Sequence, residues 1–272
     1  MKAKPKAPCI EDLRLFDTCV TLGRLPYGGR EWLTPDNVLQ VMDKYDVAEA
    51  LVHHNEARQH YPRSVGNELL LRQIEGMPRL HPVWVLEPPP APDPRGARMM
   101  VEEMLAAGVK AARLMMGVAP PLHWLWKDLC EALEEHRVPC LLDFAASRGW
   151  ASQSTQGNPD DLMVDQIRKI CLAHPDLQMI LSHASGGLGL SHAVLPLMHR
   201  VTNLHLDITS VIDYWRKAAI EIGPERVFFA TGMPFYDPAI LVSNVQYCHE
   251  IDDDAKRKIC GDNLRLLLEG VR

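Results

Sequence analysis

The stretch Gln178-Met-Ile-Leu-Ser-His183-Ala-Ser-Gly-Gly187 contains the pattern on which the rest of the chain is built. Its apolar residues form a run that leads directly into a polar cluster and two glycines. A parallel strand that is buried on both faces has such a run, without the alternation of a half-exposed strand. We therefore expect a buried strand here, with His183 and Ser185 where the strand opens into a loop.

Working outward from this stretch, the same pattern recurs along the chain. Seven further segments are predicted to be strands, at residues 13–19, 48–52, 81–86, 109–115, 138–142, 203–207 and 226–231. Helices are predicted at about 35–45, 64–77, 95–107, 124–136, 159–173, 192–200, 211–222, 238–248 and 252–268. Thr34 and Pro35 form a helix start signal, and Gly108 stands where a helix is expected to stop.

Eight strands that alternate with helices form either a closed barrel or a doubly wound sheet. The units are regular, and the chain has no Gly-x-Gly-x-x-Gly turn, so the pattern favours a (β/α)8 TIM barrel. No linker or repeat divides the chain. We expect one domain over residues 1–272, with residues 1–10 as a flexible tail.

The composition narrows the classes of partner. The 272 residues are 47% hydrophobic and 24% charged, with a net charge of −6, which gives no reason to expect nucleic acid or a membrane surface as a partner. No apolar run is long enough for a membrane helix, and the basic start lacks the apolar core of a signal peptide. Seven scattered cysteines without a Cys-x-x-Cys pair indicate reduced thiols in a cytoplasmic protein.

The carboxyl ends of barrel strands form the active-site face, so polar residues there are the candidates for a small-molecule site. These residues are His54, Trp84, Arg113, Asp143, Arg148, His183, Ser185, Asp207 and Thr231. His53 and His54 point to opposite sides if both lie on the strand, and we choose His54 as the one that faces the centre. Asp207 has a second interpretation, as a cap for Ser210.

Several segments resemble the amidohydrolase superfamily, especially its branch of small decarboxylases and lactonases. The matching text is Phe16-Asp17-x-x-x-x-Leu22-Gly23, His174-Pro-Asp-Leu177 with Leu181-Ser-His183, Asn203-Leu-His-Leu-Asp207, Gly223-Pro-Glu-Arg226 with Thr231-Gly-Met-Pro234, and Ile259-Cys-Gly-Asp-Asn263. The resemblance implies a metal-assisted barrel hydrolase or lyase. It also implies a homodimer as a possible assembly.

The chain departs from the superfamily at its metal ligands. The family has His-x-His where this chain has Cys19-Val-Thr21, a histidine where it has Asp143, and an aspartate where it has Gly232; only His183 is kept. Two chemistries remain open. Cys19, Asp143 and His183 could bind one divalent ion, with zinc the best match to these ligands. Alternatively no metal binds, as in the lactonases that the chain resembles.

Without a metal, Arg113, His54 and Arg148 would hold an anionic substrate, and Asp143 or His183 would act as the general base. A carboxylate beside a guanidinium is a weak base, so His183 is preferred for proton transfer. Each residue also has a structural interpretation: a salt bridge between Asp143 and Arg113, a structural role for His183, and a small buried side chain for Cys19.

We therefore expect a hydrolase or decarboxylase that acts on a small, polar, carboxylate-bearing molecule without the standard metal centre. The alternative is a catalytically inactive relative that binds a ligand or serves as an assembly subunit. The polar groups retained at the strand ends favour the enzyme, because burying them without use is costly.

Overall fold

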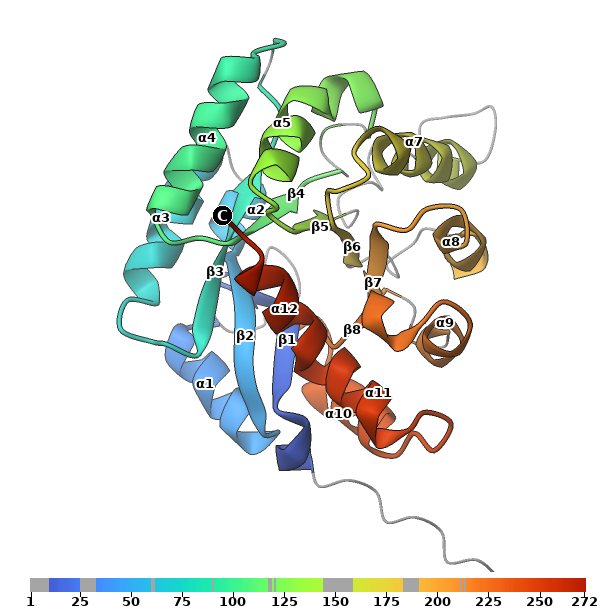
Figure 1. Ribbon diagram of the computed structural model, residues 1–272. Helices are drawn as coiled ribbons and strands as arrows, with labels where there is room; N and C mark the ends of the chain where they lie inside the picture. The colour runs from blue at the N-terminus through green and yellow to red at the C-terminus, as the bar shows by residue number, and fades with distance from the viewer. Residues whose placement is uncertain are drawn as a thin grey trace, which may run out of the picture.

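The computed structural model contains a barrel of parallel strands surrounded by helices (Figure 1). It describes residues 10–24, 33–59, 62–89, 91–116, 119, 121–143, 159–182, 191–210, 212 and 214–272. The strands are β1 (Leu15–Leu22), β2 (Val47–His54), β3 (Leu80–Leu86), β4 (Ala111–Leu114), β5 (Cys140–Asp143), β6 (Met179–Ser182), β7 (Leu204–Asp207) and β8 (Val227–Phe228). They pair in chain order, all parallel, which confirms the predicted (β/α)8 TIM-barrel fold class.

The barrel is closed by contacts between β1 and the segment that follows β8. The Thr18 amide donates to the Phe229 carbonyl at 3.0 Å, and the Thr21 amide donates to the Met233 carbonyl at 2.9 Å. β8 itself has only two residues, much shorter than the predicted 226–231. Closure therefore depends on backbone hydrogen bonds beyond the regular strand.

Most of the helices surround the barrel of strands, and α12 crosses one end of it. They are α1 (Pro35–Lys44), α2 (Asn55–Gln59), α3 (Arg63–Gln73), α4 (Pro94–Ala106), α5 (His123–Glu135), α7 (Pro159–Ala173), α8 (Ser191–Met198), α9 (Trp215–Glu221), α10 (Pro238–Gln246), α11 (Asp253–Arg257) and α12 (Asn263–Glu269). The short helical turns are η1 (Ile10–Leu13), η3 (Pro224–Arg226) and η4 (Lys258–Asp262). Within the described part of the chain, none of the helices has the length and apolar character needed to cross a bilayer.

The capping signals in the sequence act as predicted. The Thr34 hydroxyl accepts from the Asn37 amide at the start of α1, with Pro35 in the first helical position. Gly108 follows α4 with φ +78°, a left-handed conformation that favours glycine. α2 was not predicted, because its five residues are too few to have a helical period.

Alternation along the strands divides the core into an inner and an outer layer. Phe16, Leu51, Val83, Leu141 and Ile180 form the inner cluster together with Leu264 of α12. Their strand neighbours on the opposite parity, such as Val52 and Leu142, belong to the cluster beneath the helices. α12 lies across the amino-terminal end of the barrel (Figure 1), so that end is filled with apolar side chains and the polar strand ends face the other mouth.

Candidate functional site

Arg113 and Asp143 meet at the carboxyl ends of β4 and β5. Arg113 Nε lies 2.8 Å from Asp143 Oδ2, and both side chains are fully buried. Arg58 of α2 binds the same carboxylate twice, through Nε to Oδ2 at 2.8 Å and through Nη2 to Oδ1 at 3.2 Å. One aspartate is therefore held between two guanidinium groups. The predicted salt bridge between Asp143 and Arg113 is present.

Arg113 also reaches across the barrel. Its two terminal nitrogens lie 3.7 Å from Cys19 Sγ, and Nη2 lies 3.5 Å from Ser182 Oγ. Burial alone would lower the pKa of Arg113, but the Asp143 carboxylate outweighs it and the pKa is raised. Arg113 is therefore a permanent cation in the centre of the barrel mouth.

Strand parity explains why these residues converge. Ala111 and Leu141 belong to the inner cluster, so Arg113 and Asp143, two residues further along, also point inward. Arg58 comes from α2, whose Ala57 packs with Val85 in a third buried cluster. The Arg58 guanidinium lies 5.4 Å from the centre of the Phe235 ring, a cation–π distance.

α2 is fixed in place by Arg63 of α3. Arg63 Nη1 donates to the carbonyl oxygens of Ala57 and Arg58, at 3.0 and 2.9 Å. Its Nε and Nη2 each lie 3.0 Å from Glu87 Oε2, just beyond β3. Arg63 thus satisfies carbonyl groups at the end of α2 that the short helix leaves without partners, and connects α2 to the barrel wall.

A second polar group lies on the β1 side of the mouth. Asp17 Oδ1 accepts from the amides of Cys19 at 2.9 Å and Thr231 at 3.0 Å, and Oδ2 accepts from the Thr231 hydroxyl. Burial raises the pKa of Asp17 to about 7, and the nearby Asp207 adds to the rise. Asp17 is therefore a buried acid that gains and loses its proton near neutral pH.

Asp207, at the end of β7, is also buried. Its Oδ1 accepts from the Ser210 amide at 3.0 Å and from the Thr209 hydroxyl at 2.5 Å. Burial raises the pKa of Asp207, while hydrogen bonds from Thr209, Ser182 and Ser210 lower it. Its capping of Ser210 is present, as the second interpretation of this residue predicted.

Two predicted site residues lie elsewhere than we expected. His53, not His54, shares the inward parity of Leu51, and its Nε2 lies 3.1 Å from Thr21 Oγ1. His54 is packed beside Gly23, and burial lowers its pKa. Trp84 lies between the inward Val83 and Val85, so its ring packs on the outer cluster and does not line the mouth. The directions of both side chains are set by which residues of each strand face inward. The sequence did not reveal this, because neighbouring residues in these strands are too similar to show an alternation.

The remaining predicted residues divide into two groups. Thr231 is at the mouth, but its hydroxyl donates a hydrogen bond to Asp17 Oδ2 and accepts one from the Met233 amide at 3.2 Å. His183, Ser185 and Arg148 lie outside the described residues. Their predicted roles stay predictions.

Sequence reasoning gave no role to Arg58 or Asp17, which the structure places in the site. Arg58 follows His53 and His54 closely in sequence. It reaches Asp143 at the mouth only because the chain forms the short helix α2 directly after β2. Asp17 is part of the motif that resembles the amidohydrolases. Its partner Thr231, which follows β8, was predicted as a site residue from the sequence. A search for pairs of polar residues across the β1–β8 seam would have found this pair.

Among the described groups at the mouth, Asp143, Asp17 and Cys19 do not fit a divalent cation, and Oδ2 of Asp207 is the carboxylate oxygen that lacks a hydrogen-bond partner. Both oxygens of Asp143 accept from guanidinium groups, and both oxygens of Asp17 accept from Thr231 or Cys19. Burial raises the pKa of Cys19 to about 12, so its sulfur remains a protonated thiol beside Arg113. In the described ranges, no three His, Cys, Asp or Glu side chains are grouped as metal ligands would be.

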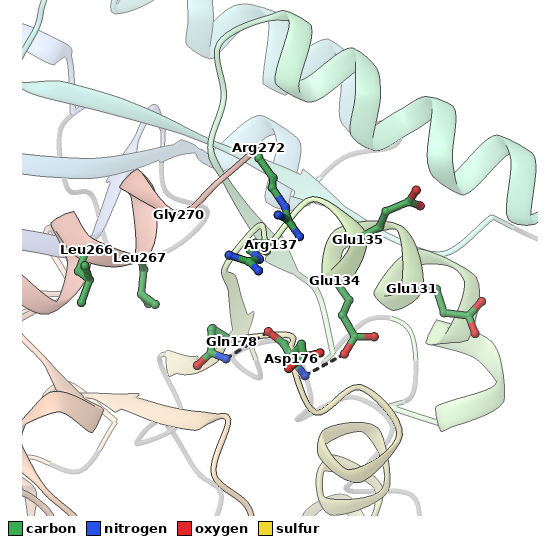
Figure 2. A pocket seen from close by; sticks show the side chains of 10 residues that line it. All are labelled: Glu131, Glu134, Glu135, Arg137, Asp176, Gln178, Leu266, Leu267, Gly270 and Arg272. Atoms are coloured by element: carbon green, nitrogen blue, oxygen red, sulfur yellow. Dashed lines mark hydrogen bonds between the residues drawn. The ribbon is translucent and has the colours of Figure 1, made fainter.

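Three cavities with described linings lie away from this mouth. A volume of about 690 Å³ opens at the amino-terminal ends of β5 and β6, between α5 and α12 (Figure 2). Its walls carry Glu131, Glu134, Arg137 and Arg272, and Glu134 accepts from the Asp176 amide at 2.9 Å. A second, of about 450 Å³, lies at the same end near Glu49 and Arg265. A third lies outside the wall, against Trp84.

Comparisons with known proteins agree with the barrel. The amidohydrolase family matches residues 37–268. No curated protein matches the sequence significantly. An uncharacterised TIM-barrel protein from Bordetella bronchiseptica superimposes with a TM-score of 0.69 at 18% identity, over 94% of this chain and 98% of that one.

Two solved decarboxylases are similar in the same way. For 5-carboxyvanillate decarboxylase from Sphingomonas paucimobilis the TM-score is 0.68 at 15% identity, over 96% of this chain and 100% of the other. For dihydroxybenzoic acid decarboxylase from Polaromonas the TM-score is 0.67 at 16% identity, over 94% of this chain and 96% of the other. That second structure contains manganese and the inhibitor 2-nitroresorcinol. At these identities the likeness establishes the fold.

Proposed function

Because the chain belongs to the amidohydrolase family, we propose that it is a hydrolase or decarboxylase of that type. Its substrate is a small, polar, carboxylate-bearing molecule. The reaction takes place at the carboxyl ends of the strands, around Arg58, Arg113 and Asp143, without the divalent metal centre of the family. The single observation that carries this proposal is the buried cation of Arg113 at the centre of the mouth.

The balance of charge supports an anionic substrate. Two guanidinium groups face one carboxylate in this cluster, so one positive charge is left over among Arg58, Arg113 and Asp143. The neighbouring thiol of Cys19 does not offset it, since its pKa is raised to about 12. An uncompensated buried charge is costly, and a bound carboxylate would relieve that cost. Arg58, which is 5% exposed, is the guanidinium nearer to solvent.

Two residues are candidates for proton transfer. His183 directly follows Ser182, whose hydroxyl lies 3.5 Å from Arg113, and we assign it the role of general base. Asp17, with a pKa of about 7, is suited to exchange a proton at neutral pH. Asp143 binds both arginines, so we assign it to holding them in place.

The absence of a resident metal is part of the proposal. The manganese of the Polaromonas decarboxylase belongs to that protein. Here the carboxylate of Asp143 already binds guanidinium groups, and Arg113 supplies positive charge at the same place. Electrostatic stabilisation of a developing negative charge can come from such a fixed cation.

The mutual pairing of Arg58, Asp143 and Arg113 also favours the alternative function, a non-catalytic relative that binds a ligand. A carboxylate that is fully paired has a structural role whether or not a reaction occurs. Under this alternative an anionic ligand would still bind, but no product would form.

A turnover assay separates the two functions. The full chain would be incubated with lactones and with aromatic and aliphatic carboxylates, and both carbon dioxide and hydrolysis products would be measured. We expect turnover of a carboxylate-bearing compound, with His183→Ala reducing kcat by at least about 100-fold. Unchanged turnover in His183→Ala would exclude the assigned base. Binding without turnover on any compound would favour the non-catalytic relative.

Metal analysis of protein prepared without chelator tests the metal-free site. We expect less than about a tenth of an equivalent of any divalent ion, and unchanged turnover after dialysis against a chelator. A full equivalent whose removal abolishes turnover would contradict the proposal.

A further inference from the structure

The third cavity lies on the outside of the barrel wall, between α3, α4 and the carboxyl end of β3. We call it the α3–α4 cavity. Its volume is about 430 Å³, within the range of about 300–1,000 Å³ that is common for small-molecule sites. Met99, one of its lining residues, is 48% exposed, so the cavity opens to solvent along α4.

The walls of the cavity are mainly apolar. One wall is a single face of α4, where residues three and four positions apart lie side by side: Gly96, Met99, Met100 and Glu103. The barrel side is formed by Trp84 of β3. Flexible methionines opposite a tryptophan can pack against apolar bodies of various shapes.

Most hydrogen-bond donors of the lining are already in use. All three nitrogens of Arg63 donate, Nε and Nη2 to Glu87 Oε2 at 3.0 Å and Nη1 to two carbonyl groups of α2. The Asn67 amide group donates to the Val85 carbonyl at 3.0 Å and accepts from the Val85 amide at 2.9 Å. Nε1 of Trp84 has almost no accessible surface, so a guest cannot reach it.

Two carboxylates of the lining have oxygens left for a guest. Glu103 is exposed, and its side chain has no ion pair or hydrogen bond within the described part of the chain. Both contacts of Glu87 with Arg63 use Oε2, which leaves Oε1 available. The lining therefore has two negative groups and one positive group, while the Ser64 hydroxyl can either donate or accept. This balance of charge favours a cation.

We propose that the α3–α4 cavity binds a small organic cation that consists of an ammonium group on an apolar body. The ammonium group contacts the carboxylate of Glu103, and the apolar body packs between Met99 and Trp84. The proposal does not rest on the proposed function, because none of the charged groups of the mouth lines this cavity. Its failure would leave that function unchanged.

Three probes that share a fluorophenyl ring and differ in charge test the proposal. The full chain is titrated with 2-(4-fluorophenyl)ethylamine, 2-(4-fluorophenyl)ethanol and 4-fluorophenylacetate, and the fluorine NMR signal is followed. We expect saturable binding of the amine at least about threefold tighter than binding of the alcohol, as a partly exposed ion pair would give. The carboxylate should bind most weakly.

Glu103→Gln removes the charge and keeps the size of the side chain, so it should bind the amine and the alcohol equally. Glu102→Gln is the matched control, because Glu102 is also exposed on α4 but does not line the cavity. This control should keep the preference for the amine. An equal loss of preference in the two variants would mean that the amine responds only to the general surface charge, and would overturn the proposal.

Met99→Lys tests the position of the guest. A lysine four residues before Glu103 places an ammonium group of the chain itself beside that carboxylate, and should weaken binding of the amine at least about threefold. Ile220→Lys makes the same change at a site on α9 that is 62% exposed, and should bind the amine as the unmodified chain does. Unchanged binding in Met99→Lys, equal affinity for amine and alcohol in the unmodified chain, or saturable binding of no probe would overturn the proposal.

Discussion

At the scale of single residues, Asp143 is the group on which two buried cations depend. Replacing it by asparagine keeps the shape but leaves Arg58 and Arg113 without their anionic partner. We expect Asp143→Asn to lower the free energy of unfolding by about 3–5 kcal/mol, because a buried charge without its partner is strongly destabilising. Urea unfolding followed by circular dichroism measures this loss.

A surface ion pair provides the matched control for this change. Glu131 lies 2.6 Å from Lys127, with both side chains about half exposed. Glu131→Gln should change the stability by less than about 1 kcal/mol. Equal effects of the two substitutions would mean that Asp143 does not hold the arginines as described.

Asp17 is expected to give the chain a pH-dependent stability. Its folded pKa of about 7 lies above the ordinary value of 3.8, so the folded state keeps a proton that the unfolded state has lost. Stability is therefore lost as the pH rises between these two values and is constant above them. The loss from this group amounts to about 4 kcal/mol at most.

Asp17→Asn removes that titration while preserving an acceptor for the amides of Cys19 and Thr231. We expect the Tm of the variant, relative to the unmodified chain, to rise from pH 5 to about pH 7 and then to level off. Thermal unfolding at several pH values measures this difference. Asp253→Asn on the surface of α11 is the control and should give a constant difference. A constant difference for Asp17→Asn as well would contradict the raised pKa.

At the scale of elements, the packing of α3 on α2 determines where Arg58 lies. A Cβ added at Gly66 would lie 2.0 Å from the backbone nitrogen of Ala57, so no side chain fits there. Gly66→Ala must push the helices apart, at a cost of about 1–3 kcal/mol. We expect turnover to fall together with Tm, because Arg58 moves with α2.

Gly270 provides the control for the glycine substitution. The nearest atom to a Cβ at Gly270 is 3.4 Å away, an ordinary contact. Gly270→Ala should leave both Tm and turnover within error of the unmodified chain. If Gly66→Ala did the same, α2 would not depend on this close approach.

The elements also show how far the sequence alone could lead. The β/α alternation, Thr34 and Gly108 predicted the barrel and its helix ends, because period and caps are local properties. Whether His53 or His54 faces inward depends on the phase of β2, which is determined by its pairing with β1. A five-residue helix such as α2 has no period to read.

The candidate site could also be predicted only in part from the sequence. Arg113 pairs with Leu141, and Asp143 lies two residues further along the adjacent strand with the same inward parity, so their meeting followed from the barrel itself. Arg58 reaches Asp143 from 85 positions away in sequence through a turn that only the folded structure reveals. The outward direction of Trp84 likewise required knowing which strand residues pack inside.

At the scale of the whole molecule, the two ends of the barrel have separate tasks. The amino-terminal end is filled by the inner cluster, to which α12 contributes Leu264 at 1% exposure. The other end holds the charged groups of the mouth. Substitutions at the amino-terminal end should therefore change stability without changing the chemistry, as is usual in this fold.

Leu264→Ala tests this separation. Removing the side chain leaves a hollow beneath Phe16 and Phe228, and we expect the free energy of unfolding to fall by about 2–5 kcal/mol. At a temperature where the variant is still folded, kcat/KM should stay within about twofold, because the inner cluster that holds Leu264 contains none of the charged groups described at the mouth. Leu266→Ala, at a position that is 70% exposed on the same helix, should change neither quantity. A large loss of kcat/KM in folded Leu264→Ala would mean that packing at the closed end reaches Arg113 through the strands, and the two ends would then form one coupled unit.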